Sequence, residues 1–217
     1  MKTLSIDTST DYLSIAIMDG KKILAGYHRP SQRNHSRLLL PTIAKLIKRA
    51  GLKIKDIGGF CVSVGPGSFT GLRIGVVTVK GLAYALNKPV VTVPTLDVIA
   101  RNAKGFEGIV CPVIDAKKNK VYACIYKSDG VNFKKISKHM LLPVDSLLKL
   151  TGVYDKVLFL GDGVKLVGAE EKIKNWHPRA DVAAGIALED FNNKRFVSPE
   201  KLEPMYIYSR DCAITGK

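Results

Sequence analysis

Residues 3–20, TLSIDTSTDYLSIAIMDG, decide the fold that this sequence predicts. The segment contains an apolar strand over residues 3–8, a turn rich in hydroxyl groups, and a second strand over residues 12–18. Asp19 and Gly20 follow, and this dipeptide is a strong signal for a tight hairpin turn. We therefore expect three strands to open the chain, the third over residues 22–28.

The same order of features returns in residues 109–130, IVCPVIDAKKNKVYACIYKSDG. Ile114-Asp115 corresponds to Ile6-Asp7 at an offset of 108 residues, and Asp129-Gly130 corresponds to Asp19-Gly20 at an offset of 110. A strand–aspartate–turn–strand unit repeated at half the chain length indicates two similarly built lobes. The sequence therefore predicts an α/β protein with a duplicated mixed sheet. The predicted lobes are residues 1–103 and 104–217.

The rest of the chain alternates helical patterns with buried strands. Between the repeated segments we predict helices over 34–50, 69–86 and 95–102, and strands over 59–64 and 90–93. Around and after the second segment we predict strands over 109–115, 121–126, 156–160 and 202–208, and helices over 144–150, 165–175 and 180–191. Ser68 and Asn87 have the residue types that cap and end a helix, whereas Pro41 predicts a kink or a late start in the first helix.

Composition places the chain among soluble globular proteins. Of 217 residues, 46% are hydrophobic and 24% are charged, which excludes a disordered tail, a collagen-like rod and a membrane channel. The longest apolar run, residues 109–114, is far below the roughly 20 residues that span a bilayer. Asp7 interrupts any signal-peptide core, so we expect a cytoplasmic protein that does not contact a membrane.

The charge is strongly positive. Thirty-four Lys and Arg residues against 19 Asp and Glu residues leave +15, which favours nucleic acid, or a complex that handles it, as a partner. The alternative is a lysine bias spread evenly over the surface. Residues 101–140 hold nine basic residues against three acidic ones, without an aromatic RNA-binding signature.

Cysteine and histidine spacing argues against a metal centre. Cys61, Cys111 and Cys124 lie in apolar strand-like runs, where a thiol acts as a small core residue, and no Cys-x-x-Cys pair occurs. No two histidines have the i, i+4 spacing of a helical metal pair, since Leu39 stands four residues after His35. We therefore expect neither a metal nor another cofactor.

The turn after the first strand, Asp7-Thr8-Ser9, is a candidate remnant of a nucleotide cleft together with Asp115. An aspartate at a strand end beside hydroxyl groups can hold a hydrated metal or cradle a phosphate. The alternative is an ordinary turn whose side chains bond their own backbone.

The glycine-rich run of residues 65–71, GPGSFTG, joins a buried strand to a helix N-terminus. Unpaired N–H groups there favour an anion, but the run matches neither a P-loop nor a dinucleotide fingerprint. Gly71 and Gly75 share a helix face, so we favour close packing against another helix backbone.

The two long helices carry apolar residues beyond one stripe. Leu38–Leu40 form a continuous triplet, and apolar residues from Phe69 to Val77 spread around more than one face. Such a helix must be buried on a second side, by the lobe core or by a partner subunit.

Several motifs together resemble the bacterial TsaB family, also called YeaZ, of tRNA threonylcarbamoyladenosine biosynthesis. They are LSIDTST, HSRLLLP, VSVGPGSFTGLRIG, PVVTVPTLD, GDG and PMYIYSR, and the resemblance extends over nearly the whole chain. The resemblance implies the two-lobed actin-like ATPase (ASKHA, RNase H-like) fold. It also implies a chain without catalytic residues, because Leu39 stands where the catalytic paralogue TsaD has the second histidine of its HxxxH metal pair.

The resemblance further implies partners. A TsaD-like catalytic subunit would dock on the two long helices, a TsaE-like ATPase would join, and the complex would modify N6 of adenosine 37 in tRNAs that read ANN codons. Without the catalytic subunit, the same surface would form a homodimer. The implied interface residues are His35, Leu38, Leu39, Phe69, Leu72, Arg73 and Val76.

Two other classes of function stay open at this point. One is an enzyme, either a small ATPase using Asp7 and Asp115 or a glycoprotease-like metallopeptidase. The other is a direct tRNA-binding module that uses the basic segment 101–140.

Overall fold

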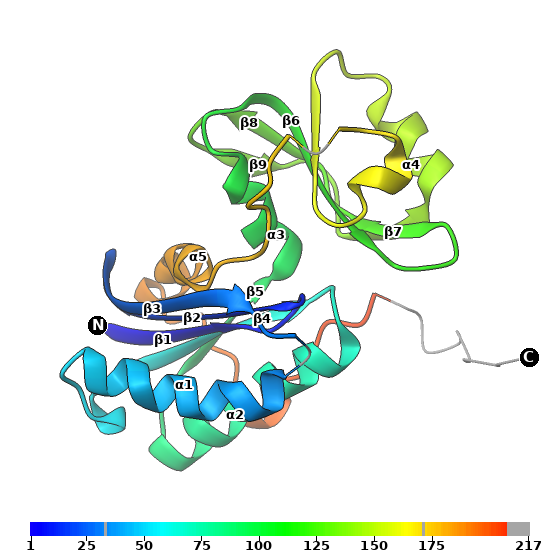
Figure 1. The fold of residues 1–217 in the computed structure, drawn as a ribbon. Coiled ribbons are helices and arrows are strands. Elements are labelled where there is room, and N and C mark those ends of the chain that lie inside the picture. Colours follow the sequence, from blue (N-terminus) through cyan, green and yellow to red (C-terminus); the bar gives the residue numbers. More distant parts are fainter. Residues whose placement is uncertain (33, 171, 208–217) are drawn as a thin grey trace, which may run out of the picture. The chain divides into compact units, whose positions relative to one another are not determined.

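The computed structural model describes residues 1–32, 34–170 and 172–207 of the chain. The described residues form two compact units. The first contains Met1–Val98 and His177–Pro204, and the second contains Ile99–Trp176 with residues 205–207. Each unit is built around its own β-sheet (Figure 1).

The first unit has a five-stranded sheet in the order β3-β2-β1-β4-β5. The first three strands are antiparallel neighbours, whereas β4 and β5 run parallel to β1. Asp19 pairs with Lys22 across the predicted hairpin turn, which is therefore confirmed. The strands are β1 (Lys2–Asp7), β2 (Tyr12–Asp19), β3 (Lys22–Pro30), β4 (Gly59–Gly65) and β5 (Val90–Pro94).

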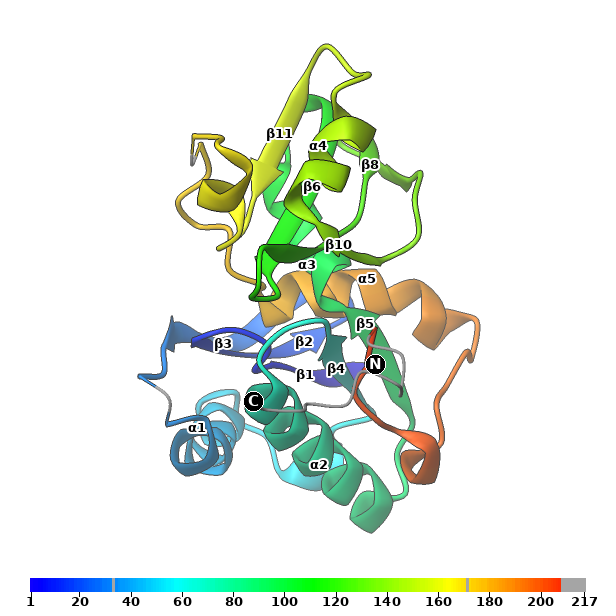
Figure 2. The ribbon, with the colours of Figure 1, turned by 90° about the vertical axis from the view of Figure 1, so that its right-hand side faces the viewer.

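Helices cover both faces of this sheet. Helices α1 and α2 lie on one face and α5 lies on the other, as Figures 1 and 2 show. Helix α2 has the predicted limits because Ser68 accepts a hydrogen bond from the N–H of Gly71, and Asn87 ends the helix in the left-handed conformation. The helices are α1 (His35–Arg49), α2 (Phe69–Leu86), α3 (Thr95–Ala100), which begins in this unit, and α5 (Ala180–Asn192).

The second unit repeats the first arrangement. Strand β6 pairs antiparallel with β7 and β8 and parallel with β11, as β1 pairs with β2 and β4. The predicted duplication is therefore confirmed at the level of strand pairing. The elements are β6 (Glu107–Asp115), β7 (Lys120–Ala123), β8 (Tyr126–Asp129), β9 (Phe133–Lys135), β10 (Met140–Pro143), α4 (Val144–Thr151) and β11 (Val157–Leu160).

The single strand predicted over residues 121–126 is interrupted. Val113 pairs with Ala123 and Val110 pairs with Tyr126, so one register runs through both β7 and β8. Pro112 lies in the gap and has no N–H to donate, which accounts for the break. The Asp129-Gly130 turn joins β8 to β9.

Helix α1 runs from His35 to Arg49 through Pro41, so it has no late start, and the alternative of a kink at Pro41 stays a prediction. Two other predictions were wrong. Of the helix predicted over 165–175, the described residues form only a 3-10 turn, Val164–Val167, because Gly168 leaves the helical region at φ +66°. Residue 171 lies outside the described part of the chain. Residues 202–207 are not a strand, and residue 208 lies outside the described part of the chain.

The lobe limits of residues 1–103 and 104–217 stay a prediction. One feature of the structure bears on how the first unit is assembled. Helix α5, which follows the second sheet in the sequence, packs on β1, β2, β4 and β5 of the first. Its alanines contact the small side chain of Ala16 on β2, and Ala180 donates its N–H to the buried hydroxyl of Ser14. The first unit is thus built from both ends of the chain.

Candidate functional site

The predicted turn at the end of β1 is buried. Asp7, Thr8 and Ser9 expose no more than 1% of their surface. Asp7 Oδ1 accepts hydrogen bonds from the backbone N–H of Ser9 at 2.9 Å and from its hydroxyl at 2.8 Å. This is a side-chain-to-backbone turn of the ordinary kind, closed in on itself.

The electrostatic setting of Asp7 disfavours a charged carboxylate. Burial raises the pKa of Asp7 above its usual value, and the hydroxyls of Ser63 and Ser9 with the N–H of Ser9 offset this only in part. Its second oxygen, Oδ2, has no hydrogen-bond partner among the described residues. A metal ion needs an ionised and accessible carboxylate, and Asp7 lacks that access here.

The start of α2 fills the space above this turn. Thr8 donates its hydroxyl to the carbonyl of Gly71 at 2.7 Å, and Ser68 donates its N–H to the carbonyl of Ser9 at 2.7 Å. A Cβ on Gly71 would lie 2.1 Å from the Thr8 carbonyl oxygen, and one on Gly75 would lie 2.4 Å from the Thr8 hydroxyl. The glycines therefore serve close packing, as predicted, but their neighbour is this turn and not another helix.

Asp115 occupies the equivalent strand end in the second unit, in a different setting. It accepts hydrogen bonds from the backbone N–H of Lys117 at 2.7 Å and from the Lys117 ammonium, and its own N–H donates to Asp162. Slight burial raises its pKa, but these contacts outweigh burial and leave the pKa lowered. A cleft shared by Asp7 and Asp115 stays a prediction.

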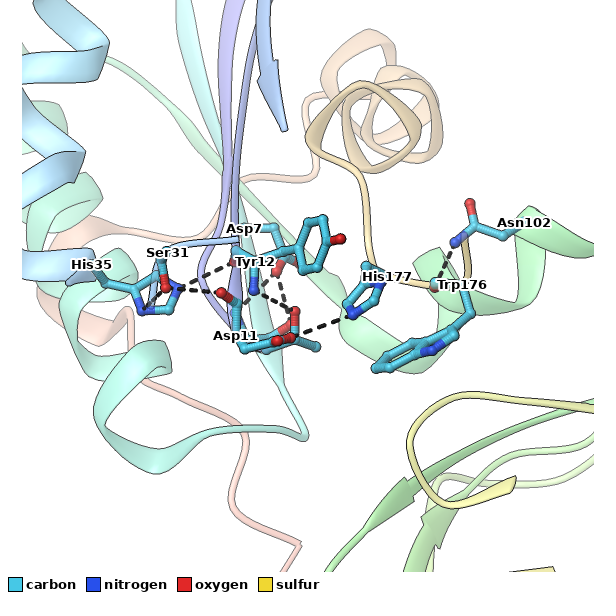
Figure 3. Close-up of polar contacts among 10 residues, drawn as sticks. Asp7, Asp11, Tyr12, Ser31, His35, Asn102, Trp176 and His177 are labelled. Carbon is cyan, nitrogen blue, oxygen red and sulfur yellow. Dashed lines mark hydrogen bonds and ion pairs between the residues drawn. The ribbon is translucent and has the colours of Figure 1, made fainter. Parts of the chain in front are cut away.

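His35 holds the start of α1 in place. Its Nδ1 lies 3.2 Å from the Ser31 hydroxyl, and its Nε2 lies 3.2 Å from the Tyr12 carbonyl oxygen (Figure 3). The ring is buried, and both nitrogens are engaged within the first unit. His35 therefore acts here as a structural link between α1 and the sheet.

The predicted interface residues divide into two groups by burial. Leu39, Leu72 and Val76 are 1%, 3% and 2% exposed and belong to the core of the first unit. Phe69 is 55% exposed, and the Arg73 guanidinium lies 3.8 Å above its ring centre. Leu38 is half-buried and His35 is buried.

Three further apolar residues on these helices are exposed. Leu40 on α1, and Val77 and Tyr84 on α2, are 55%, 65% and 72% exposed. The sequence indicated Leu40 and Val77 as part of the apolar excess without assigning them to the interface, whereas Tyr84 was missed. The signal was helical spacing, because Val77 lies two turns after Phe69 and Tyr84 two turns after Val77. Leu40 also borders a groove whose lining includes Ile43 and Ile47 of α1 and Leu82 of α2.

Helix α2 is unusually apolar for a helix with so much exposed surface. Its mean hydropathy is 1.3 over 18 residues, and only 33% of these are buried. By length and composition alone it is the one helix among the described residues that could cross a membrane. Helix α2 packs along β4 in the first unit, so one side of this apolar helix is held by the sheet while the other is exposed.

A ring stack at the start of β2 was also missed. Tyr12 stacks on His177 with ring centres 3.8 Å apart, and His177 Nε2 lies 3.4 Å from the Asp11 carboxylate (Figure 3). His28 lies beside Tyr12, and burial together with Arg179 and His177 lowers its pKa to about 4. The stack holds His177, the residue at which the chain re-enters the first unit, against Tyr12 at the start of β2.

Comparison with known proteins shows which family model and which solved structures this chain resembles. Residues 29–194 match the family model "TsaD: tRNA N6-adenosine threonylcarbamoyltransferase". A solved structure, YeaZ from Pseudomonas aeruginosa, superposes with a TM-score of 0.82 at 26% identity over 94% of this chain and 99% of that one. Component A of (R)-2-hydroxyglutaryl-CoA dehydratase from Acidaminococcus fermentans, at 12% identity and a TM-score of 0.51, shares the fold alone.

Curated proteins of similar sequence identify the family more specifically than the fold does. TsaB of Bacillus subtilis is 33% identical over 167 residues, which are 76% of this chain and 73% of that protein. TsaB of Escherichia coli is 28% identical over 95% of this chain and 94% of its own length. Fold and family model together define a TsaD-type protein with the actin-like ATPase fold. Within that class the chain belongs to the TsaB (YeaZ) family, and its role is in tRNA threonylcarbamoyladenosine biosynthesis.

Proposed function

We propose that this chain is a non-catalytic subunit of the threonylcarbamoyl transfer complex. In this proposal it pairs with a TsaD-like catalytic subunit, and a TsaE-like ATPase joins the pair. The complex transfers the threonylcarbamoyl group to N6 of adenosine 37 in tRNAs that read ANN codons. The proposed location is the cytoplasm.

The exposed apolar side of α2 is the observation that carries this proposal. Phe69, Val77 and Tyr84 line it as apolar side chains exposed by more than half, and Leu40 on the neighbouring α1 is exposed to a similar extent. Aromatic and aliphatic residues beside an arginine, here Arg73, are typical of the centre of a protein–protein interface. We propose this surface, named here the α1/α2 surface, as the docking site for the catalytic subunit.

The settings of Asp7 and His35 support the non-catalytic part of the proposal. Asp7 is fully buried beneath the start of α2, and both nitrogens of His35 are engaged within the unit. A catalytic carboxylate or metal ligand must reach its substrate or metal, and neither side chain is accessible. We propose that the turn after β1 now supports α2, which in turn presents the docking surface.

The proposal also includes self-association. The same α1/α2 surface would be covered by a second copy of this chain when the catalytic subunit is absent. Self-pairing and pairing with the catalytic subunit would then exclude each other.

An omission assay tests the subunit role. Unmodified tRNA, threonylcarbamoyl-adenylate, ATP, TsaD and TsaE are incubated with and without this chain, and labelled threonine is followed onto tRNA. We expect transfer to need the chain, and the chain alone to transfer nothing. If omission changes nothing, the proposal is wrong, and ATP hydrolysis by the chain, abolished by Asp7→Ala, becomes the activity to test.

Charge substitutions test the surface. Glutamate at Leu39 or Val76 would bury a charge and unfold the unit, so the exposed Val77 is the position to change. We expect Val77→Glu to weaken pairing with TsaD at least about tenfold, about 1.4 kcal/mol, with unchanged thermal unfolding. Val153→Glu is the matched control, because Val153 is 77% exposed in the second unit. Equal pairing by both variants would place the interface elsewhere.

A further inference from the structure

We propose that the outer hairpin of the second sheet, β8 and β9, binds the phosphate backbone of tRNA directly. The surface, named here the basic edge, consists of Lys127 on β8, Lys134 on β9, and Lys138 shortly after β9. All three side chains are exposed. This goes beyond the subunit role, because it assigns a nucleic-acid contact to this chain itself.

Like charges face each other inside this hairpin. Lys127 pairs directly with Lys134 across β8 and β9, where side chains on one face have their Cβ atoms about 5 Å apart. Two ammonium groups in that position destabilise the pair of strands unless an anion lies between or above them. The repulsion therefore destabilises the hairpin, and a bound polyanion would remove this destabilisation.

Acidic residues do not neutralise the basic edge. Asp129 is the only carboxylate between residues 126 and 139. It is used by the turn, where it accepts hydrogen bonds from the N–H groups of Val131 and Asn132, and these contacts lower its pKa to about 2. In the described parts of the chain, the ammonium groups of Lys127, Lys134 and Lys138 form no ion pair.

The position in the sheet leaves this surface open to a partner. Strand β9 ends the strand order of the second sheet, so one of its edges is unpaired. Lysines on edge strands also prevent sheets from joining edge to edge, a role that Lys134 on β9 can fill. That role does not require Lys127, which lies on the inner strand of the hairpin and increases the repulsion.

The chemistry fits a nucleic-acid backbone better than an acidic protein. Lysine ammonium groups on flexible stems bind phosphates as point charges without fixed geometry. The aromatic residues of this hairpin are Tyr126, which is only 1% exposed, and Phe133, which is half-buried, so neither ring is fully presented for stacking on bases. The family acts in tRNA modification, and tRNA supplies the matching polyanion. Contacts of this kind position RNA and carry no sequence preference.

Fluorescence anisotropy with full-length chain and unmodified tRNA, without any other protein, tests the proposal. The test variant changes Lys127, Lys134 and Lys138 to glutamine. The control variant removes the same charge from the first unit, at the exposed Lys21, Lys55 and Lys201. Both sets are surface lysines, so circular dichroism is expected to show wild-type folding for each.

We expect the test variant to bind tRNA at least about tenfold more weakly than the control at about 0.1 M salt. The plot of the log of the association constant against the log of the salt concentration has a negative slope. This slope should become less steep by about 2, as expected for three lost phosphate contacts. Equal affinities and slopes for the two variants would overturn the proposal, and so would a wild-type chain that does not bind tRNA at about 50 mM salt. Because TsaD is absent from the assay, neither result bears on the subunit role.

Discussion

The two strand-end turns, one in each unit, share a sequence motif but differ in burial, in the direction of the aspartate pKa shift and in their contacts. In the first unit Asp7 is completely buried, has a raised pKa, and lies beneath the glycines of α2. In the second unit Asp115 is accessible, has a lowered pKa, and pairs with the exposed Lys117. Position within a repeat therefore does not determine role. The turn at Asp7 supports helix α2, whereas the turn at Asp115 is open to solvent and charged.

The largest effect should come from separating the first turn from α2. A methyl group on Gly71 would lie 2.1 Å from the Thr8 carbonyl oxygen, and that backbone cannot move without shifting β1. We expect Gly71→Ala to destabilise the protein by about 2–4 kcal/mol in urea unfolding. Gly81→Ala on the same helix is the control, because nothing lies within 4 Å of its added methyl group. The control should gain about 0.5–1 kcal/mol from helix propensity.

Thiol labelling can show whether this damage stays in the first unit. Cys61 lies on β4 and Cys111 on β6, and burial raises the pKa of both thiols, that of Cys61 to about 12. Each thiol reacts only when its own sheet opens. We expect Gly71→Ala to speed alkylation of Cys61 much more than that of Cys111, measured by mass spectrometry. Equal acceleration would mean that the two units open together.

A smaller effect should follow from removing the charge of the buried turn. The pKa of folded Asp7 lies above its usual 3.8, so stability from the protonated form is present at low pH and is lost as pH rises through the folded pKa. Asp7→Asn keeps the Oδ1 acceptor and cannot ionise. We expect its melting temperature to exceed that of the wild type by several degrees at pH 7, with no gain near pH 3.8. A variant that is less stable than the wild type at pH 7 would contradict a raised pKa for folded Asp7.

The smallest effect should come from the matching change in the second unit, with the opposite sign. The pKa of folded Asp115 is lowered, so its contribution is present above pH 3.8 and is lost as pH falls through the folded pKa. We expect Asp115→Asn to lower the melting temperature slightly at pH 7 and not at low pH, because solvent screens an exposed pair. A large loss at pH 7 would contradict the picture of an open surface turn.

Local signals allowed much of the first unit to be predicted. Helix α2 begins and ends where its capping residues indicated, and the hairpin at Asp19-Gly20 formed as expected. These features depend on residues close in the sequence. The resemblance supplied the family, which the comparisons confirmed.

Features that depend on distant parts of the chain could not be predicted in this way. Helical spacing places Val76 and Val77 on different faces, but only the packed sheet determines that Val76 is buried and Val77 exposed. The neighbour of Gly71 was expected to be a helix because its spacing indicates close packing without naming the partner. The ring stack of Tyr12 on His177 joins residues 165 positions apart, and periodicity carries no such information.

The return of α5 to the first sheet has a consequence for synthesis of the protein. The ribosome makes β1 to β5 early, yet the sheet face that holds Ala16 and Val91 stays uncovered until residues 180–192 emerge. Domains that can complete their cores fold as they leave the ribosome, but this one must wait for nearly the whole chain. The nascent protein therefore exposes an apolar sheet face for most of translation, the kind of surface that holdase chaperones bind.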